Sequence, residues 1–161
     1  MGWIPEVTVA AVVAHERKFL LVEELIDGRL VLNQPAGHLE PEETLLAGVV
    51  RETREETAWR FVPRALVGTY LWRAAGDGRS FMRFAFCGEV DDHRPHQPLD
   101  QGIVRTLWLT REEMQARQDH LRSPLVLRCV DDYLLGIRLP LDPVAGLDLE
   151  SARHAPSVVN L

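Results

Sequence analysis

Three glutamates at helical spacing are the residues of this sequence best suited to chemistry. Glu52, Glu55 and Glu56 stand at positions i, i+3 and i+4 of a segment whose apolar residues recur with helical period. A helix turns by about 100° per residue, so the three carboxylates form a ridge. Like charges at this spacing repel one another, and the ridge lies near the helix end that carries partial negative charge. A hard divalent cation such as Mg²⁺ or Mn²⁺ would offset that repulsion, because these ions prefer carboxylate oxygens.

An acidic helix face is common, and Glu55–Glu56 alone would indicate only a solvated surface. The residues before the triad change this interpretation. Gly37, Glu43 and Arg51 precede it at fixed spacing. We expect Arg51 to orient the carboxylates through charge-assisted hydrogen bonds. Glu43 is interpreted equally as a brace for the loop or helix start and as an exposed first-turn glutamate favoured by the helix dipole. The whole segment therefore predicts a cation site rather than a solvated helix face.

The segment from Gly37 to Trp59 resembles the Nudix box, G-x5-E-x7-R-E-U-x-E-E-x-G-U, where U is an aliphatic residue. The matching glycine and polar positions are Gly37, Glu43, Arg51, Glu52, Glu55 and Glu56. Membership of the Nudix family implies an α/β/α sandwich with a mixed β-sheet, in the α/β (α+β) class. It also implies a Mg²⁺ cofactor, with Mn²⁺ as an alternative, held on the box helix.

Two positions depart from the box. Ala58 replaces its second glycine, and a left-handed conformation there would cost an alanine ~1 kcal/mol. Thr53 replaces an aliphatic residue, and we expect its hydroxyl to bond back to the Val49 carbonyl. Neither change removes a proposed metal ligand, so the enzymatic interpretation stands.

The resemblance extends over roughly residues 6–142. Short strings are similar to the NudJ-type branch of Nudix phosphatases: VTVA (7–10), KFL (18–20), NQPAGHLE (33–40), MRF (82–84) and LRSPLV (121–126). Such enzymes remove orthophosphate from nucleoside tri- and diphosphates or from thiamine-type pyrophosphates. Alternatives within the fold are a pyrophosphohydrolase of nucleotide sugars, dinucleotides or oxidised nucleotides, a ligand sensor without activity, and a protein scaffold. Retention of a self-repelling carboxylate triad argues against the sensor.

The resemblance assigns roles within the box. Glu52 and Glu56 are the first candidates for metal ligands, with Glu55 binding directly or through water and the Gly37 carbonyl completing the set. The cation would activate a water for in-line attack on phosphorus. Glu55 or Glu56 would take the proton of that water, and Arg51 supports the catalytic carboxylates.

Four further residues are candidates for contact with substrate. Arg83 lies in an apolar strand and is interpreted equally as a phosphate contact or as an outward-facing arginine. Asp100 is by default an ordinary loop aspartate, and the alternative is that it is a further acidic residue that takes the proton of the attacking water. His38 follows the box glycine, and backbone bonding is its default. Arg122 precedes a predicted helix, where packing against the helix start is its default.

The helices, strands and loops that position these groups are predicted from hydrophobic periodicity and from capping and turn residues. Residues 42–57 form the box helix, with Pro41 at its first helical position. Gly48, one turn before Glu52, leaves the ridge uncrowded at a cost of roughly 1 kcal/mol. Residues 33–37 and 91–101 are predicted loops. Thr110 opens a helix with a capping box, and residues 123–124 cap another that ends near Gly136. Strands are predicted at residues 7–14, 19–23, 30–32, 65–72, 81–90 and 104–109.

Composition limits the remaining possibilities. The chain has 161 residues and a net charge of -6, which disfavours a partner such as duplex nucleic acid. No apolar run reaches the ~18 residues of a membrane span, and no export signal precedes the first strand. Two distant cysteines suit a reducing cytoplasm. We expect one domain over residues 1–142, a loosely packed tail at 143–161, and a monomer or homodimer acting on a small phosphorylated substrate.

Overall fold

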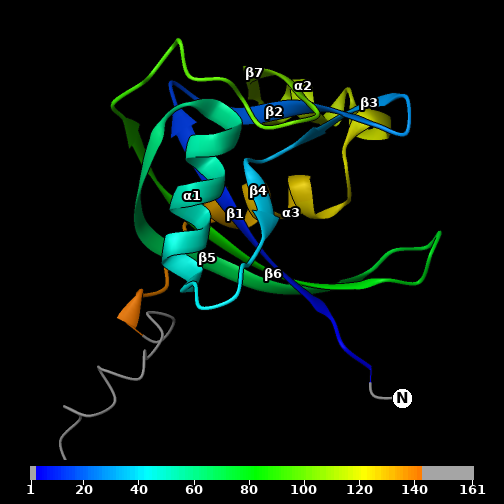
Figure 1. Ribbon diagram of the computed structural model, residues 1–161. Coiled ribbons are helices and arrows are strands. Elements are labelled where there is room, and N and C mark those ends of the chain that lie inside the picture. Colours follow the sequence, from blue (N-terminus) through cyan, green and yellow to red (C-terminus); the bar gives the residue numbers. More distant parts are fainter. Residues whose placement is uncertain (1–2, 143–161) are drawn as a thin grey trace, which may run out of the picture.

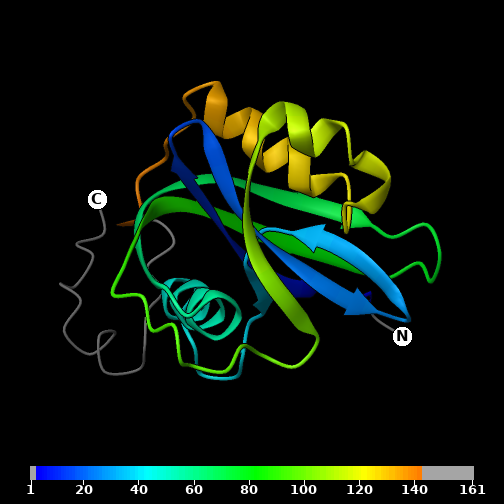
Figure 2. The same ribbon diagram turned by 90° about the horizontal axis from the view of Figure 1, so that it is seen from above.

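A computed structural model describes residues 3–142 of the chain. Figures 1 and 2 show a mixed β-sheet with helices on both of its faces. The sheet has seven strands, and its main order is β3-β2-β1-β6-β5. The architecture confirms the predicted α/β/α sandwich. The tail predicted at 143–161 lies outside the described residues.

Strand β1 (Glu6–His15) is the centre of the sheet. It runs parallel to β6 (Ser80–Asp91), which pairs antiparallel with β5 (Arg60–Arg73). On its other edge β1 pairs antiparallel with the short strand β4 (Ala36–His38). Residues 8–13 of β1 are all buried, on both faces of the sheet, as the continuous apolar run predicts.

A second group of strands leaves the first at a hairpin. β2 (Lys18–Ile26) contacts β1 only next to that turn, and it pairs antiparallel with β3 (Arg29–Asn33) and β7 (Ile103–Thr110). Because β1 and β2 pair only at this end, the two groups of strands diverge from it.

Helices cover the two faces unequally. Helix α1 (Leu45–Thr57) packs on one face, where Val49 is fully buried. The other face carries α2 (Arg111–Gln115), η1 (Gln118–His120) and α3 (Leu125–Leu134), as Figure 2 shows. The Thr110 capping box is present as predicted. No helix in residues 3–142 is both long enough and apolar enough to cross a bilayer.

Several boundaries differ from the sequence prediction: β5 begins at Arg60 rather than at residue 65, and β2 and β3 extend beyond residues 19–23 and 30–32. Helix α1 begins at Leu45, not after Pro41, because the Thr44 hydroxyl accepts a hydrogen bond from the Ala47 N–H at 3.1 Å and so caps the helix. The predicted loop 33–37 instead contributes to β4, which fills the edge of β1 by pairing Gly37 with Val9. A stretch this short has no strand pattern of its own, so only the partner strand decides its conformation.

The C-terminal end of α1 accommodates both departures from the Nudix box. Ala58 takes the left-handed conformation, with φ at 60°, and its N–H donates to the Arg54 carbonyl. The Thr53 hydroxyl donates to the Val49 carbonyl at 2.8 Å, as expected. The departures from the box at Thr53 and Ala58 therefore leave the helix and its exit in place.

Candidate active site

A cavity of about 850 Å³ lies between α1, strand β4, the β5–β6 hairpin and the segment that leads into α3. This size suits a ligand of nucleotide dimensions. The carboxylates of Glu52 and Glu56 line it, and so does the backbone of β4. The face of α1 that carries Glu52 and Glu56 therefore borders a cavity that a substrate can enter.

Glu52 and Glu56 are both buried. Burial is the main cause that raises the pKa of each, to about 9 for Glu56. The neighbouring charges of Glu24, Glu52 and Asp100 raise the pKa of Glu56 further, while a hydrogen bond of 2.8 Å from the Ala36 N–H to its Oε2 opposes the rise. Two carboxylates are therefore held close to other negative groups, where a cation would stabilise their charged forms.

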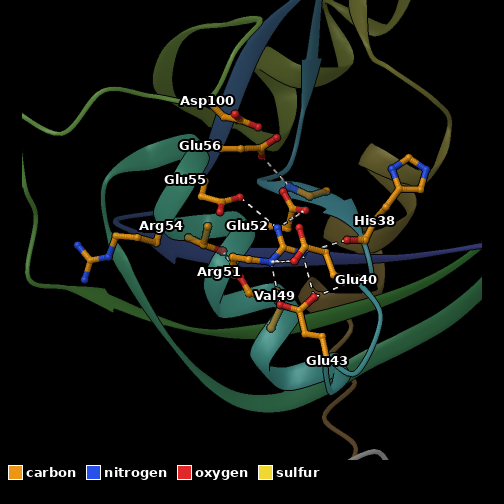
Figure 3. Close-up of polar contacts among 12 residues, drawn as sticks. His38, Glu40, Glu43, Val49, Arg51, Glu52, Arg54, Glu55, Glu56 and Asp100 are labelled. Carbon is orange, nitrogen blue, oxygen red and sulfur yellow. Dashed lines mark hydrogen bonds and ion pairs between the residues drawn. The ribbon is translucent and has the colours of Figure 1, made fainter.

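Arg51 lies at the centre of the carboxylate cluster (Figure 3). Its Nε and Nη2 donate to the two oxygens of Glu43 at 2.8 and 2.9 Å. Its Nη1 donates to Glu52 at 2.8 Å and to Glu55 at 3.1 Å, and Nη2 also donates to the His38 carbonyl at 3.0 Å. The bond from Arg51 lowers the pKa of Glu43. One guanidinium thus ties the loop after β4 to two of the three ridge carboxylates.

Two glycines permit this packing. The Gly37 backbone lies so close to the end of Glu52 that an added Cβ would overlap the carboxylate. At Gly48 an added Cβ would lie 3.0 Å from Glu43 Oε2 and 3.1 Å from Leu39 Cδ1. The space predicted at Gly48 is therefore taken by the loop before the helix, not by the ridge.

The three ridge carboxylates do not point to one place. Glu52 and Glu56 line the cavity, whereas Glu55 lies outside that lining and pairs with Arg51. Within residues 3–142, no three acidic, histidine or cysteine side chains converge closely enough to enclose a metal by themselves. Mg²⁺ keeps several waters and uses only one or two protein carboxylates. The oxygen donors of Glu52, Glu56 and the Gly37 carbonyl therefore fit such an ion.

All four residues predicted to contact substrate line the cavity: His38, Arg83, Asp100 and Arg122. Arg83 is only 7% exposed, so its interpretation as an outward-facing arginine is wrong. Side chains of α3 pack against this face of β6, which sequence periodicity did not reveal. Arg122 is exposed at the rim rather than packed at the helix start, because α3 begins only at Leu125 and the Arg122 backbone N–H donates to the Leu32 carbonyl at 2.8 Å.

His38 and Asp100 lie at the rim near α1. The His38 ring contacts Glu6 Oε2 at 2.6 Å, so its default interpretation as bonded to backbone is wrong. The Asp100 N–H donates to the Glu55 carbonyl at 2.9 Å, which fastens the loop before β7 to the end of α1. The long loop thereby brings a fourth carboxylate close to Glu52 and Glu56.

The sequence reasoning missed polar residues on the strands that face the cavity. Glu24 follows the apolar run of β2, and burial raises the pKa of its carboxyl. Thr8 and Asn33 also line the cavity, and both are buried. A polar residue within a β-branched run was the available signal at Thr8, but a single threonine is a weak one.

A family model for the NUDIX domain matches residues 4–128. The chain belongs to the Nudix family. It is 43% identical over 140 residues to the protein named phosphatase NudJ in Escherichia coli K12 and in Shigella boydii, an alignment that covers 87% of this chain and 90% of each relative.

A Nudix hydrolase of Nitrosomonas europaea has the same fold in a solved structure. It is 46% identical, with a TM-score of 0.89, over 91% of this chain and 99% of that one. This Nudix hydrolase therefore acts on phosphoanhydride bonds of small phosphorylated substrates. The family uses divalent metals, which agrees with the oxygen donors at the cavity wall.

Proposed function

We propose that this Nudix hydrolase is a Mg²⁺-dependent phosphatase that releases orthophosphate from nucleoside tri- and diphosphates or from thiamine-type pyrophosphates. The observation that carries the proposal is the pair of buried carboxylates, Glu52 and Glu56, in the wall of a cavity of about 850 Å³. The similarity to NudJ phosphatases supports orthophosphate as the product. Both cysteines of the chain are buried and free, which supports a cytoplasmic location.

Glu52, Glu56 and the carbonyl of Gly37 would hold the cation, which Mn²⁺ would also suit. When bound, the ion polarises a phosphoryl oxygen, offsets negative charge and lowers the pKa of a water. Glu55 is placed to join this set only through water, because its carboxylate lies outside the lining of the cavity.

The protein groups supply position and proton transfer. Arg51 fixes the orientation of Glu52 while its bidentate contact with Glu43 holds the loop. The attacking water loses its proton to Glu55 or Glu56. Glu56 already lines the cavity, whereas Glu55 is bonded to Arg51. Substitution of Arg51 would therefore free the carboxylate of Glu55 if Glu55 is the base. It would leave the position of the base unchanged if the base is Glu56.

The test is a substrate panel that scores each product. Purified protein is incubated with nucleoside tri- and diphosphates, thiamine pyrophosphate and nucleotide sugars, each with Mg²⁺, with Mn²⁺ and with EDTA. Cation-dependent release of orthophosphate is the expected result. Cleavage of the nucleotide sugars alone, with two phosphorylated products, would overturn the phosphatase assignment, and equal rates in EDTA would overturn the metal requirement.

A matched pair of variants localises the activity. Glu52→Gln removes a proposed ligand and keeps the shape of the side chain, so we expect turnover to fall by about 100-fold or more. Glu89→Gln makes the same change on the exposed face of β6, where Glu89 pairs with Arg64. Its turnover should stay within twofold of wild type.

A further inference from the structure

Arg83 is a buried cation with no anionic partner of its own. It lies near the start of β6, lines the cavity and is 7% exposed. Its Nη1 and Nη2 donate to neutral amide oxygens, those of Gln34 at 3.2 Å and Asn33 at 3.3 Å, and the guanidinium also contacts the buried thiol of Cys129. Throughout residues 3–142 it forms no ion pair. Burying a guanidinium is costly unless an anion compensates it, so this position favours a negatively charged ligand.

Thr8 supplies a second, independent observation. Its hydroxyl is the single buried side-chain polar atom in the described part of the chain that has no hydrogen-bond partner. Thr8 on β1 pairs with Arg83 on β6, so the two side chains lie next to each other on one face of the sheet. A buried hydroxyl without a partner costs about 1–3 kcal/mol. A ligand oxygen in the cavity would satisfy both Thr8 and Arg83.

The surrounding charges also favour an anion. Arg122 stands at the rim of the same cavity, and its charge acts on Arg83. The nearby Asp132 carboxylate is already bound, by Arg128 at 2.9 Å and by the Tyr70 hydroxyl at 2.9 Å. The charge of Glu24 acts on both Arg83 and Arg122. This part of the cavity therefore holds two cations beside the Glu24 carboxyl.

The position of Thr8 relates this cluster to the carboxylates of α1. Thr8 pairs with His38 of β4 on one side and with Arg83 on the other. Neighbouring strands lie about 5 Å apart, so Thr8 is one strand from the segment that holds Gly37. Both clusters line the same cavity, so one substrate with two phosphates can contact both.

We propose that Thr8 and Arg83 form an anion subsite for the phosphate that stays on the organic product after hydrolysis. The inference rests on the proposed function, whose substrates all keep at least one phosphate on the organic product. The phosphate that is removed lies at Glu52 and Glu56, and the phosphate that remains lies at Thr8 and Arg83. The phosphorylated product is then expected to bind the enzyme and inhibit it.

Binding of inorganic phosphate to the protein in EDTA tests the subsite by itself. Without a cation, the carboxylates of α1 repel phosphate, so calorimetric titration reports on the subsite. We expect saturable binding to wild type and at least about tenfold weaker binding to Arg83→Met. Thr8→Val should weaken binding about fivefold or more, whereas Thr8→Ser keeps the hydroxyl and should stay within twofold. Arg64→Met, at an exposed arginine, is the matched control and should bind as wild type does.

Two results would overturn the subsite: no saturable binding to wild type, or equal binding to wild type, Arg83→Met and Thr8→Val. Circular dichroism shows whether each variant is folded. If Arg83→Met does not fold, Arg83→Lys, which keeps the charge without the planar fork, and Thr8→Val carry the test. Glu52→Gln separates this proposal from the proposed function, because it should lose hydrolysis and keep phosphate binding. Phosphate binding by a wild-type protein that hydrolyses none of the panel would refute the activity and leave the subsite standing.

Discussion

Replacement of Gly37 by alanine should damage the site through one contact. The Gly37 backbone lies against the Glu52 carboxylate, and an added Cβ would overlap all three atoms at the end of that side chain. Glu52 is buried and is bonded to Arg51 Nη1 at 2.8 Å. The carboxylate therefore has to leave both its rotamer and its partner. Backbone strain plays no part, since Gly37 does not have a positive φ.

The cost follows from these two losses. An off-rotamer side chain costs about 0.5–1.5 kcal/mol, and a hydrogen bond between charged groups contributes about 1.5–3 kcal/mol. We expect Gly37→Ala to lower the free energy of unfolding by about 2–4 kcal/mol. Displacement of a catalytic group by about 1 Å can cost 100-fold in rate, so we expect turnover to fall by at least that factor.

Denaturant unfolding and orthophosphate release measure the two effects. Gly76→Ala is the matched control, because an added Cβ there meets no atom within 4 Å. A double-mutant cycle with Glu52→Ala isolates the contact. In the Glu52→Ala background, Gly37→Ala should cost less than about 0.5 kcal/mol. An equal cost in both backgrounds would show that the glycine is required for another reason, and the assignment of this contact would be wrong.

Three other substitutions test the cluster. Glu56→Gln should lower turnover by ~100-fold or more with the melting temperature nearly unchanged, because it removes a proposed ligand; turnover equal to wild type would contradict that role. Arg51→Lys should lower turnover by about 10–100-fold and also lower the melting temperature, since an ammonium does not span all the contacts of the guanidinium; wild-type values of both would exclude a positioning role. Arg51 holds the pKa of Glu43 below its ordinary value, so that stabilisation is complete above the unfolded pKa and is lost as pH falls through the folded pKa. The melting-temperature difference between wild type and Glu43→Gln should therefore shrink below about pH 4, and a difference independent of pH would refute the argument.

The sequence by itself determined the box helix and the chemistry of its ridge. The spacing of Glu52 and Glu56 places both carboxylates on one face of any helix, whatever it packs against. The continuous apolar run of β1 predicts a strand buried on both faces, and the structure buries residues 8–13. Such features are local, because helical period and burial pattern are fixed by neighbouring residues.

Only the tertiary structure decided which polar groups share the cavity. Thr8 and Arg83 are 75 positions apart, and they become neighbours because β1 and β6 pair in parallel. The burial of Arg83 depends on α3, and the direction of Glu55 depends on Arg51. The short strand β4 exists because β1 offers it an edge. These contacts join segments distant in sequence, and their energies depend on partners that no local pattern contains.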